Sequence, residues 1–403
     1  MKVRIKPGKA NGVWIAPPSK SFAHRALICA ALANGTSRIE GIEPSEDILA
    51  TLDCIEALGA EVKIEGKTAT VTGGAKELGD LFPCRESGST LRFFLPLALL
   101  RETTCTLTGS RRLLERPEDI YRDLCAKQGL YFAQDEQKIE VKGCLRAGNF
   151  PVRGDLSSQF LSGLLFALPL LASSSVIQIL SPFVSAPYVE MTEQVQKHFG
   201  IVSDHADPLA IKIPGGQTYQ AADYEVEGDY SNAAFADALG LLGGAVTVQG
   251  LNPKSCQGDR IYKTYFEELK SGSPTLDVEN CPDLAPILMA LGGALHGVEL
   301  TGTARLAVKE SDRGRAMAEE LAKFGIETEL QANRICVKAG KLHAPTESLN
   351  SHNDHRIVMA CATLLTLTGG EIEGAEAVSK SYPRYFADLK QAGIEVKTDE
   401  TDD

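Results

Sequence analysis

Two kinds of helix-forming segment alternate along the chain, and their apolar patterns distinguish them. One kind is amphipathic, which predicts a helix buried on one side and exposed on the other. It runs into a glycine, then a β-branched strand, a turn and usually a second strand. The other kind is rich in Ala and Leu on nearly every face, which predicts a helix buried all round. The alternation therefore predicts an α/β chain with buried inner helices and half-exposed outer ones.

The amphipathic unit recurs along the whole chain and ends its helix at six glycines: Gly59, Gly129, Gly200, Gly272, Gly325 and Gly393. They lie about 70 residues apart, except for the shorter step from Gly272 to Gly325. Each occupies a helix C-cap, which predicts a positive φ. In the copy around Gly272 the hairpin is eroded. An ordinary α/β chain that alternates helix and strand by default is the alternative, and the near-equal spacing disfavours it.

The domain count follows from the length and the repeat. A single hydrophobic core stops growing well before 403 residues, so two domains are expected. Six copies of a βαβ-like unit divide into three per domain. The midpoint lies near Glu227–Gly228, and no Pro-rich or low-complexity linker marks it, so the crossover should be short.

Composition narrows the functional classes. Hydrophobic residues make up 43% and charged residues 23%, as in an ordinary globular protein. The formal net charge of -12 argues against nucleic-acid binding, because a phosphate backbone repels an acidic surface. Small anions remain possible ligands if Lys and Arg are gathered locally.

The cysteines and the apolar runs indicate a cytoplasmic protein. The ten cysteines include no C-x-x-C pair, so zinc binding, thioredoxin-like redox chemistry and a disulfide framework are not expected. Residues 1–18 contain no apolar signal-peptide region, and the longest apolar runs are too short to span a bilayer.

Each predicted inner helix begins with a polar cluster. Free N–H groups and the helix dipole attract phosphate and carboxylate at such positions. Ser and Asp also cap helices without any function, so the clusters alone leave that alternative open. Capping does not explain the cations near these helix starts, which oppose the dipole: Lys20, Arg25 and Arg356.

The outer helices also begin with charged residues, at Arg116, Lys309, Glu310, Arg313 and Lys380. We therefore expect small anions to bind between the two domains. No G-x-G-x-x-G, P-loop, H-E-x-x-H or G-x-S-x-G motif points to other chemistry, and we expect no metal and no cofactor.

The polar motifs together resemble one family, 3-phosphoshikimate 1-carboxyvinyltransferase or EPSP synthase. The resemblance covers nearly the whole chain and rests on ordered motifs: PPSKSFAHRAL, ESGSTLRF, ERP, SSQFLSGLL, VSAPYVEMT, VEGDYSNAAF, PDLAP, VKESDR, NDHRIVMA and SKSYPRYF. It implies a two-domain fold of six βαββαβ-type units, three per domain, with helices inside and sheets outside. It also implies an N-terminal domain at 19–227, mainly for shikimate 3-phosphate, and a discontinuous domain at 1–18 plus 228–403, for phosphoenolpyruvate and acid–base chemistry.

The resemblance also implies two ligand sets. The residues expected to bind shikimate 3-phosphate are Lys20, Ser21, Arg25, Ser157, Ser158, Gln159, Ser185, Asp283 and Lys309. Those expected to bind phosphoenolpyruvate are Lys20, Gly88, Arg116, Gln159, Arg313, Arg356 and Lys380. Guanidinium groups suit this second substrate because they hold carboxylate and phosphate with two bonds at once.

The expected reaction is the addition–elimination of that family. The 5-hydroxyl of shikimate 3-phosphate attacks C2 of phosphoenolpyruvate while C3 is protonated, and the intermediate then loses phosphate and a C3 proton. By resemblance, Asp283 faces the hydroxyl and Glu310 faces C3, with Lys20 assisting. Domain closure would exclude water.

Five positions depart from the family pattern: Glu86, Ser89, Ala186, Arg305 and Arg384. They bear on substrate affinity more than on reaction type. Gly88 leaves room for the family's herbicide glyphosate, so inhibition is expected, and unchanged activity in a large excess of glyphosate would contradict this.

Three alternatives remain. The related UDP-N-acetylglucosamine enolpyruvyl transferases carry Lys-Asn at the first motif and a loop with a reactive Cys, whereas Ser21 follows Lys20 here and no cysteine lies nearer to Arg116 than Cys105 or Cys125. An RNA 3′-phosphate cyclase is disfavoured by the net charge. A non-catalytic binding protein on the same fold is disfavoured by Lys20, Asp283, Glu310 and Arg356. The resemblance also implies a monomer.

Overall fold

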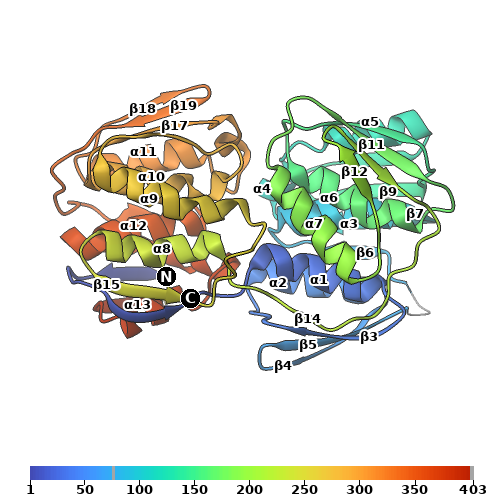
Figure 1. Ribbon diagram of the computed structural model, residues 1–403, viewed down its shortest axis with the longest axis horizontal. Helices are drawn as coiled ribbons and strands as arrows, with labels where there is room; N and C mark the ends of the chain where they lie inside the picture. The colour runs from blue at the N-terminus through green and yellow to red at the C-terminus, as the bar shows by residue number, and fades with distance from the viewer. Residues whose placement is uncertain (75–77, 400–403) are drawn as a thin grey trace. The chain divides into compact units, whose positions relative to one another are not determined.

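A computed structural model describes residues 1–74 and 78–399, and the chain divides into two compact units (Figure 1). The N-terminal unit is Pro18–Glu227, and the C-terminal unit is Met1–Pro17 together with the chain from Gly228 onward. The N–H of Ser19 donates to the Glu227 carbonyl, and the N–H of Asp229 donates to the Pro17 carbonyl, both at 2.8 Å. The crossover is thus short. The boundary lies between Pro17 and Pro18, one residue before the expected boundary between Pro18 and Ser19.

The N-terminal unit contains three four-stranded sheets with one shared topology. In each, the first two strands are parallel and the other contacts are antiparallel. The sheet orders are β14-β3-β5-β4, β6-β7-β9-β8 and β10-β11-β13-β12. The strands are β3 (Gly35–Glu40), β4 (Glu61–Glu65), β5 (Thr68–Gly73), β6 (Leu81–Pro83), β7 (Leu100–Thr108), β8 (Tyr131–Gln134), β9 (Lys138–Cys144), β10 (Asn149–Arg153), β11 (Ser175–Leu180), β12 (Asp204–Asp207), β13 (Ala210–Ile213) and β14 (Tyr224–Glu225).

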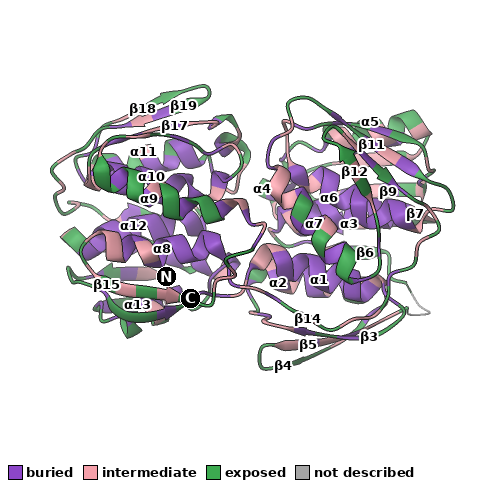
Figure 2. Cartoon of the chain, viewed as in Figure 1, coloured by how far each residue is buried: buried purple, intermediate pink, exposed green. Residues whose placement is uncertain are grey.

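Three inner helices of this unit are buried along almost their whole length (Figure 2): α1 (Lys20–Leu32), α3 (Gly88–Ala98) and α6 (Ser158–Ala167). The outer helices bury one face and expose the other: α2 (Glu46–Ala57), α5 (Asp119–Gln128) and α7 (Ala186–His198). Two short helical segments, α4 (Arg111–Leu114) and η1 (Leu168–Leu170), complete the unit.

The C-terminal unit repeats the plan with three further sheets, ordered β20-β21-β1-β22, β16-β17-β19-β18 and β15-β2. Their strands are β1 (Lys2–Ile5), β2 (Asn11–Ile15), β15 (Ala245–Gln249), β16 (Thr275–Asp277), β17 (Val298–Thr301), β18 (Thr328–Gln331), β19 (Arg334–Val337), β20 (Leu349–Asn350), β21 (Gly370–Glu373) and β22 (Val396–Asp399). The inner helices are α8 (Tyr230–Leu241), α10 (Ala285–Ala294) and α12 (His355–Thr368). The outer helices are α9 (Tyr262–Ser271), α11 (Arg313–Lys323) and α13 (Tyr385–Gln391). Four 3-10 turns come directly before α9, α10, α11 and α13 in the chain; in that order they are η2 (Gly258–Ile261), η3 (Pro282–Leu284), η4 (Ala304–Val308) and η5 (Ala375–Lys380).

The eroded hairpin is confirmed by the strand pairing. Strand β15 pairs with β2 alone, in a parallel register, whereas every other sheet of the described residues has four strands. After α9 the chain runs directly into β16 and forms no hairpin of its own. The repeat is therefore complete in five copies and shortened in one.

The same region explains one wrong expectation about the glycines. Gly59, Gly129, Gly200, Gly325 and Gly393 all have a positive φ, as predicted for a helix C-cap. Gly272 does not, because its φ of 167° is extended. Without a hairpin, the chain leaves α9 in an extended path and needs no left-handed turn there.

The inner helices begin at the expected polar residues. The side chains of Ser87, Ser157, Asp229 and Asp354 accept main-chain N–H groups in the first turns of α3, α6, α8 and α12. These caps hold the helix starts in place and leave the charged residues beside them for other roles. The ten cysteines, all within the described residues, form no disulfide bond. Within the described ranges, no helix has both the length and the apolar character needed to cross a membrane.

Candidate functional site

In the C-terminal unit, Arg313 binds three carboxylates at once. Its side chain is 1% exposed. Nε donates to Asp354 at 2.9 Å, Nη1 to Asp283 at 2.6 Å and Nη2 to Glu310 at 2.8 Å. The first residue of α11 thereby connects three segments that lie far apart in the sequence.

The local structure explains why these carboxylates meet there. Asp283 lies in η3, the turn that leads into α10, and Glu310 lies just before α11. Asp354 caps α12 and is fully buried. Its Oδ1 accepts the N–H of Arg356 at 2.9 Å, and its Oδ2 also accepts the Ser311 hydroxyl at 3.0 Å. One side chain thus fixes a helix start and orients Arg313.

Asp283 is surrounded by cations. Besides Arg313, its carboxylate lies 3.7 Å from Lys309 Nζ and 3.3 Å from Arg356 Nη2. Burial opposes ionisation, but Lys309, Arg313 and Arg356 together hold the pKa of Asp283 well below its usual value. At neutral pH the carboxylate is therefore ionised, and at 22% exposure it remains partly accessible.

For Lys309 and Asp259, unlike Asp283, burial shifts the pKa toward the neutral form of the side chain. Desolvation lowers the pKa of Lys309 to about 8, even though Asp283 favours its charged form. Asp259, in η2, accepts the Ser231 hydroxyl, and burial together with the nearby charge of Asp283 raises its pKa to about 7. Both groups therefore change their charge near neutral pH.

Arg356 and Lys380 are the other two cations of the C-terminal unit that were expected to bind phosphoenolpyruvate. Arg356 donates Nη1 to the Asn232 side chain at 3.3 Å, and its guanidinium lies 5.9 Å from the centre of the Phe235 ring. The amino group of Lys380 donates to the Asn353 carbonyl at 2.7 Å. Both side chains are less than a tenth exposed.

In the N-terminal unit, oxygen atoms of hydroxyls and carbonyls orient Arg25, which is 3% exposed. Nε donates to the Thr192 hydroxyl at 2.7 Å, Nη1 to the Ser21 carbonyl and Nη2 to the Tyr188 carbonyl, both at 2.8 Å. One turn before Arg25, Lys20 forms an ion pair with Asp47 at 2.6 Å.

A second group of this unit surrounds the start of α3. A Cβ on Gly88 would lie 2.6 Å from Arg116 Nη1, so the guanidinium packs directly against the glycine. Gln159 bridges the same region, because its amide donates to Ser89 at 3.0 Å and its oxygen accepts Arg92 Nη1 at 2.8 Å. The structure thus brings Gly88, Arg116 and Gln159 together.

The candidate serines lie at helix starts. Ser157 caps α6, and Ser158 is its first, buried residue. Ser185 precedes α7 with φ 58° and ψ 34°, a left-handed conformation that is uncommon for a residue other than glycine. Such strain occurs often at functional sites.

The unusual positions do not behave alike. Arg305 donates to the Glu279 carbonyl at 3.2 Å and is half-buried. Arg384 is 54% exposed and pairs with Asp388 of α13, the helix that it precedes. Glu86 and Ser89 are half-buried beside Gly88, and Ala186 begins α7.

Four further side chains support the site, and sequence reasoning did not assign them a role. Asp354 holds Arg313, Thr192 holds Arg25, and the buried Arg92–Glu118 pair at 2.9 Å supports Gln159. The NDHR motif drew attention to the Asp354 region but not to its partner. For Thr192, Arg92 and Glu118 the contacts exist only once the helices pack.

Solved structures with this arrangement define the class of the fold. An EPSP synthase from Acinetobacter baumannii superposes with a TM-score of 0.78 at 22% identity, over 98% of this chain and 100% of that one. The enolpyruvyl transferase NikO from Streptomyces tendae gives 0.78 at 14% identity, over 98% of both chains. The fold is therefore that of the two-domain enolpyruvyl transferases.

The sequence comparisons identify the family within that class. The family model for EPSP synthase (3-phosphoshikimate 1-carboxyvinyltransferase) matches residues 5–389. Curated proteins of that name from Clostridium kluyveri and Clostridium acetobutylicum are each 38% identical, over 98% of this chain and 98% of their own length. The chain belongs to the EPSP synthase family and is an enzyme of the shikimate pathway, which leads to the aromatic amino acids.

Proposed function

We propose that the cluster around Arg313 carries out the acid–base steps of enolpyruvyl transfer from phosphoenolpyruvate to the 5-hydroxyl of shikimate 3-phosphate. The products are 5-enolpyruvylshikimate 3-phosphate and phosphate. The observation that carries the proposal is the placement of Asp283 and Glu310 on two nitrogens of one buried guanidinium. An acid and a base are thereby held at a fixed separation by a group that cannot itself lose its proton.

Asp283 is proposed as the base for the 5-hydroxyl. Its low pKa keeps the carboxylate ionised, and its partial exposure leaves room for a hydroxyl to approach. As the O5–C2 bond forms, Asp283 accepts the hydroxyl proton. Lys309 beside it is proposed to bind the 3-phosphate, so the same pair would orient the shikimate ring.

Glu310 is proposed to act at C3 of phosphoenolpyruvate, with Lys20 assisting. In the addition step C3 gains a proton while C2 bonds to O5. In the elimination step the C2–O bond to phosphate breaks, C3 returns a proton, and the double bond forms again. General acid–base groups of this kind contribute roughly 10²–10⁴-fold to the rate.

The ligand assignments are proposals of the same kind. For shikimate 3-phosphate they are Lys20, Ser21, Arg25, Ser157, Ser158, Gln159, Ser185, Asp283 and Lys309. For phosphoenolpyruvate they are Lys20, Gly88, Arg116, Gln159, Arg313, Arg356 and Lys380. The N-terminal unit would thus serve mainly shikimate 3-phosphate and the C-terminal unit mainly the acid–base steps. The buried guanidinium groups of both units support this, because arginine holds carboxylate and phosphate oxygens in pairs.

Phosphate release from phosphoenolpyruvate, with and without shikimate 3-phosphate, tests the proposal. Release should require the acceptor and should fall by roughly 10²–10⁴-fold in Glu310→Gln. Glu319→Gln changes an exposed carboxylate on α11, the helix that Glu310 precedes; it is the matched control and should keep full activity. Equal turnover by the two variants would exclude Glu310 as the acid.

A second acceptor and the state of the enzyme can be tested with the same preparation. UDP-N-acetylglucosamine in place of shikimate 3-phosphate should release no phosphate, and release there would move the assignment to that related class.

We also propose a monomeric enzyme of the cytoplasm. Light scattering that gives twice the chain's mass of 43.2 kDa would contradict the first part.

A further inference from the structure

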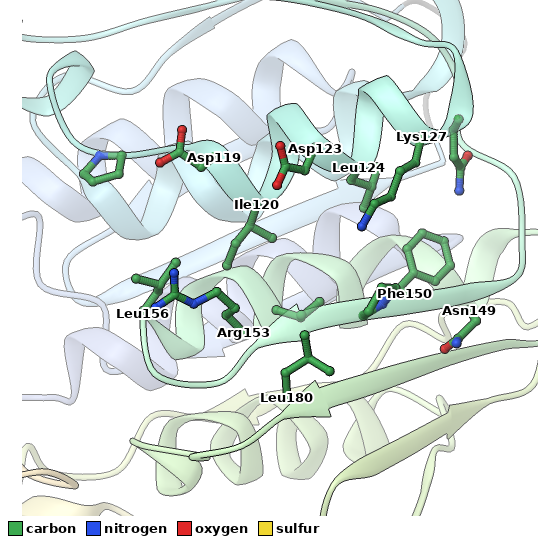
Figure 3. A pocket seen from close by; sticks show the side chains of 14 residues that line it. Asp119, Ile120, Asp123, Leu124, Lys127, Asn149, Phe150, Arg153, Leu156 and Leu180 are labelled. Carbon is green, nitrogen blue, oxygen red and sulfur yellow. The ribbon is translucent and has the colours of Figure 1, made fainter.

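A cavity of about 410 Å³ lies within the N-terminal unit, between helix α5 and strands β10 and β11 (Figure 3). None of its lining residues belongs to the proposed substrate ligands. Its volume falls in the range of roughly 300–1,000 Å³ that small-molecule sites occupy. It is therefore large enough for a ligand of its own.

The helix pattern explains why this space stays open. Tyr121 and Cys125 turn one face of α5 into the core and are fully buried. Ile120 and Leu124 lie on a neighbouring face, stay half-buried, and point toward β10 in Figure 3. Across the cavity Leu180, the last residue of β11, is 45% exposed. The apolar stripe of α5 thus faces another apolar surface without filling the space.

The charges around the cavity fall into two groups. Asp119 pairs with Arg122, and Arg153 pairs with Asp155, both at 2.6 Å, so these charges are already compensated. Asp123 and Lys127 also line the cavity and are exposed. Among residues 1–74 and 78–399, neither has a hydrogen bond or ion pair with the other or with any other side chain.

Asp123 and Lys127 are placed for a zwitterion. They are four residues apart on α5, so their Cβ atoms lie about 5–6 Å apart on one face. One carbon atom that carries both an ammonium and a carboxylate fits between such a pair. Leu124, the residue after Asp123, lines the same cavity and is an apolar neighbour of this pair.

We propose that this cavity binds an α-amino acid with a large apolar side chain. Its ammonium pairs with Asp123, its carboxylate with Lys127, and its side chain packs on Ile120, Leu124 and Leu180. Glycine lacks that side chain and should not bind. The site is independent of the acid–base assignments above, because it shares no residue with them.

Calorimetric titration of the substrate-free enzyme with L-phenylalanine, L-leucine and glycine tests the proposal. The first two should bind saturably and glycine should not. 3-Phenylpropionate lacks the ammonium and phenethylamine lacks the carboxylate, and each should bind up to about fivefold more weakly than L-phenylalanine, since exposed ion pairs are worth at most about 1 kcal/mol.

Two variants assign the charges. Asp123→Asn should weaken L-phenylalanine up to about fivefold and leave 3-phenylpropionate unchanged, whereas Lys127→Gln should weaken L-phenylalanine and leave phenethylamine unchanged. Lys197→Gln is the matched control, because Lys197 is an exposed lysine in the last turn of α7, away from the cavity. It should bind all three like the unchanged enzyme.

A third variant tests the apolar part. Leu180→Glu should abolish binding of L-phenylalanine, and the exposure of Leu180 means that the fold tolerates the change. The proposal is overturned if neither L-phenylalanine nor L-leucine binds saturably. It is equally overturned if Lys127→Gln and Leu180→Glu bind L-phenylalanine as tightly as Lys197→Gln does.

Discussion

The two units hold their central arginines by different means. In the C-terminal unit, Arg313 donates to three carboxylates, and two of these are the proposed base and acid. In the N-terminal unit, Arg25 donates to the Thr192 hydroxyl and to main-chain carbonyls. Both guanidinium groups are almost fully buried, so the difference lies in the partners and not in the exposure.

The partners determine what each arginine can do. Burial disfavours the charged form of Arg313, but its three carboxylate partners favour that form and raise the pKa of Arg313 above its usual value. Arg313 is thus a fixed centre that orients the proposed acid and base. A hydroxyl or a carbonyl oxygen orients a guanidinium without cancelling its charge. Arg25 is thus oriented by oxygen atoms of Thr192, Ser21 and Tyr188, and Arg313 by the carboxylates that are proposed to transfer protons.

The largest effect is expected from removing charge next to Arg313. Asp354→Asn keeps an amide oxygen that can still cap α12 but removes the negative charge of the carboxylate that accepts from Nε of Arg313. Breaking one partner of a buried ion pair costs about 3–5 kcal/mol, and two other carboxylates remain here, so we expect a loss near 3 kcal/mol. Chemical denaturation would measure it.

Asp312→Asn is the matched control for this change. Asp312 caps α11 through the N–H of Arg315 but is exposed. Its replacement by another good capping residue should change the stability by less than about 0.5 kcal/mol. If Asp354→Asn were as stable as Asp312→Asn, the carboxylate would not be what holds Arg313.

A smaller effect is expected at the hydroxyl that orients Arg25. Thr192→Val keeps the shape and leaves Nε of Arg25 without that acceptor, at a cost of about 1–3 kcal/mol. We expect the affinity for shikimate 3-phosphate to fall by about tenfold, with the affinity for phosphoenolpyruvate unchanged. Thr192→Ser, which keeps the hydroxyl, should restore it. An equal loss for both substrates would mean that Thr192 supports the fold and not the ligand.

The fold could be read from the sequence because its signals are local. Apolar periodicity predicted the inner and outer helices, and the spacing of the recurring glycines predicted the six copies of the unit. The failure at Gly272 marks the limit of that reasoning. A glycine after an amphipathic helix predicts a left-handed cap only if the chain must turn back, and the pairing of β15 with β2 removes that need.

The site was harder, because its geometry depends on contacts between distant segments. Lys20, Arg25 and Arg356 were visible as cations where the helix dipole disfavours them, and Arg313 as a charged residue at the start of an outer helix. Their acceptors were not visible, since Asp354 reads as an ordinary N-cap and Thr192 as an ordinary helix residue. Burial turns both into partners of an arginine, and no local pattern reports burial of that kind.

Gly88, at the start of α3, allows a test of Arg116, the cation that packs against it. Gly88→Ala would place a methyl group 2.6 Å from Arg116 Nη1, so the guanidinium must move. Because it is the far end of a flexible side chain, we expect little loss of stability and a rise of about tenfold in KM for phosphoenolpyruvate. An unchanged KM would remove Arg116 from the proposed ligands.

The smallest expected effect concerns Lys309, the cation beside Asp283. Burial lowers its pKa to about 8, so the protonated form, which is the form proposed to bind phosphate, is lost as the pH rises through 8. Between pH 7 and pH 8.5 the protonated fraction, and with it the affinity for shikimate 3-phosphate, should fall about fourfold. The phosphate itself is fully ionised over this range, since the second pKa of a phosphate ester is about 6. Lys309→Arg should bind with little pH dependence, because a guanidinium stays charged. A fourfold fall that persists in Lys309→Arg would place the titrating group elsewhere, with Asp259 as the next candidate, since its pKa is about 7.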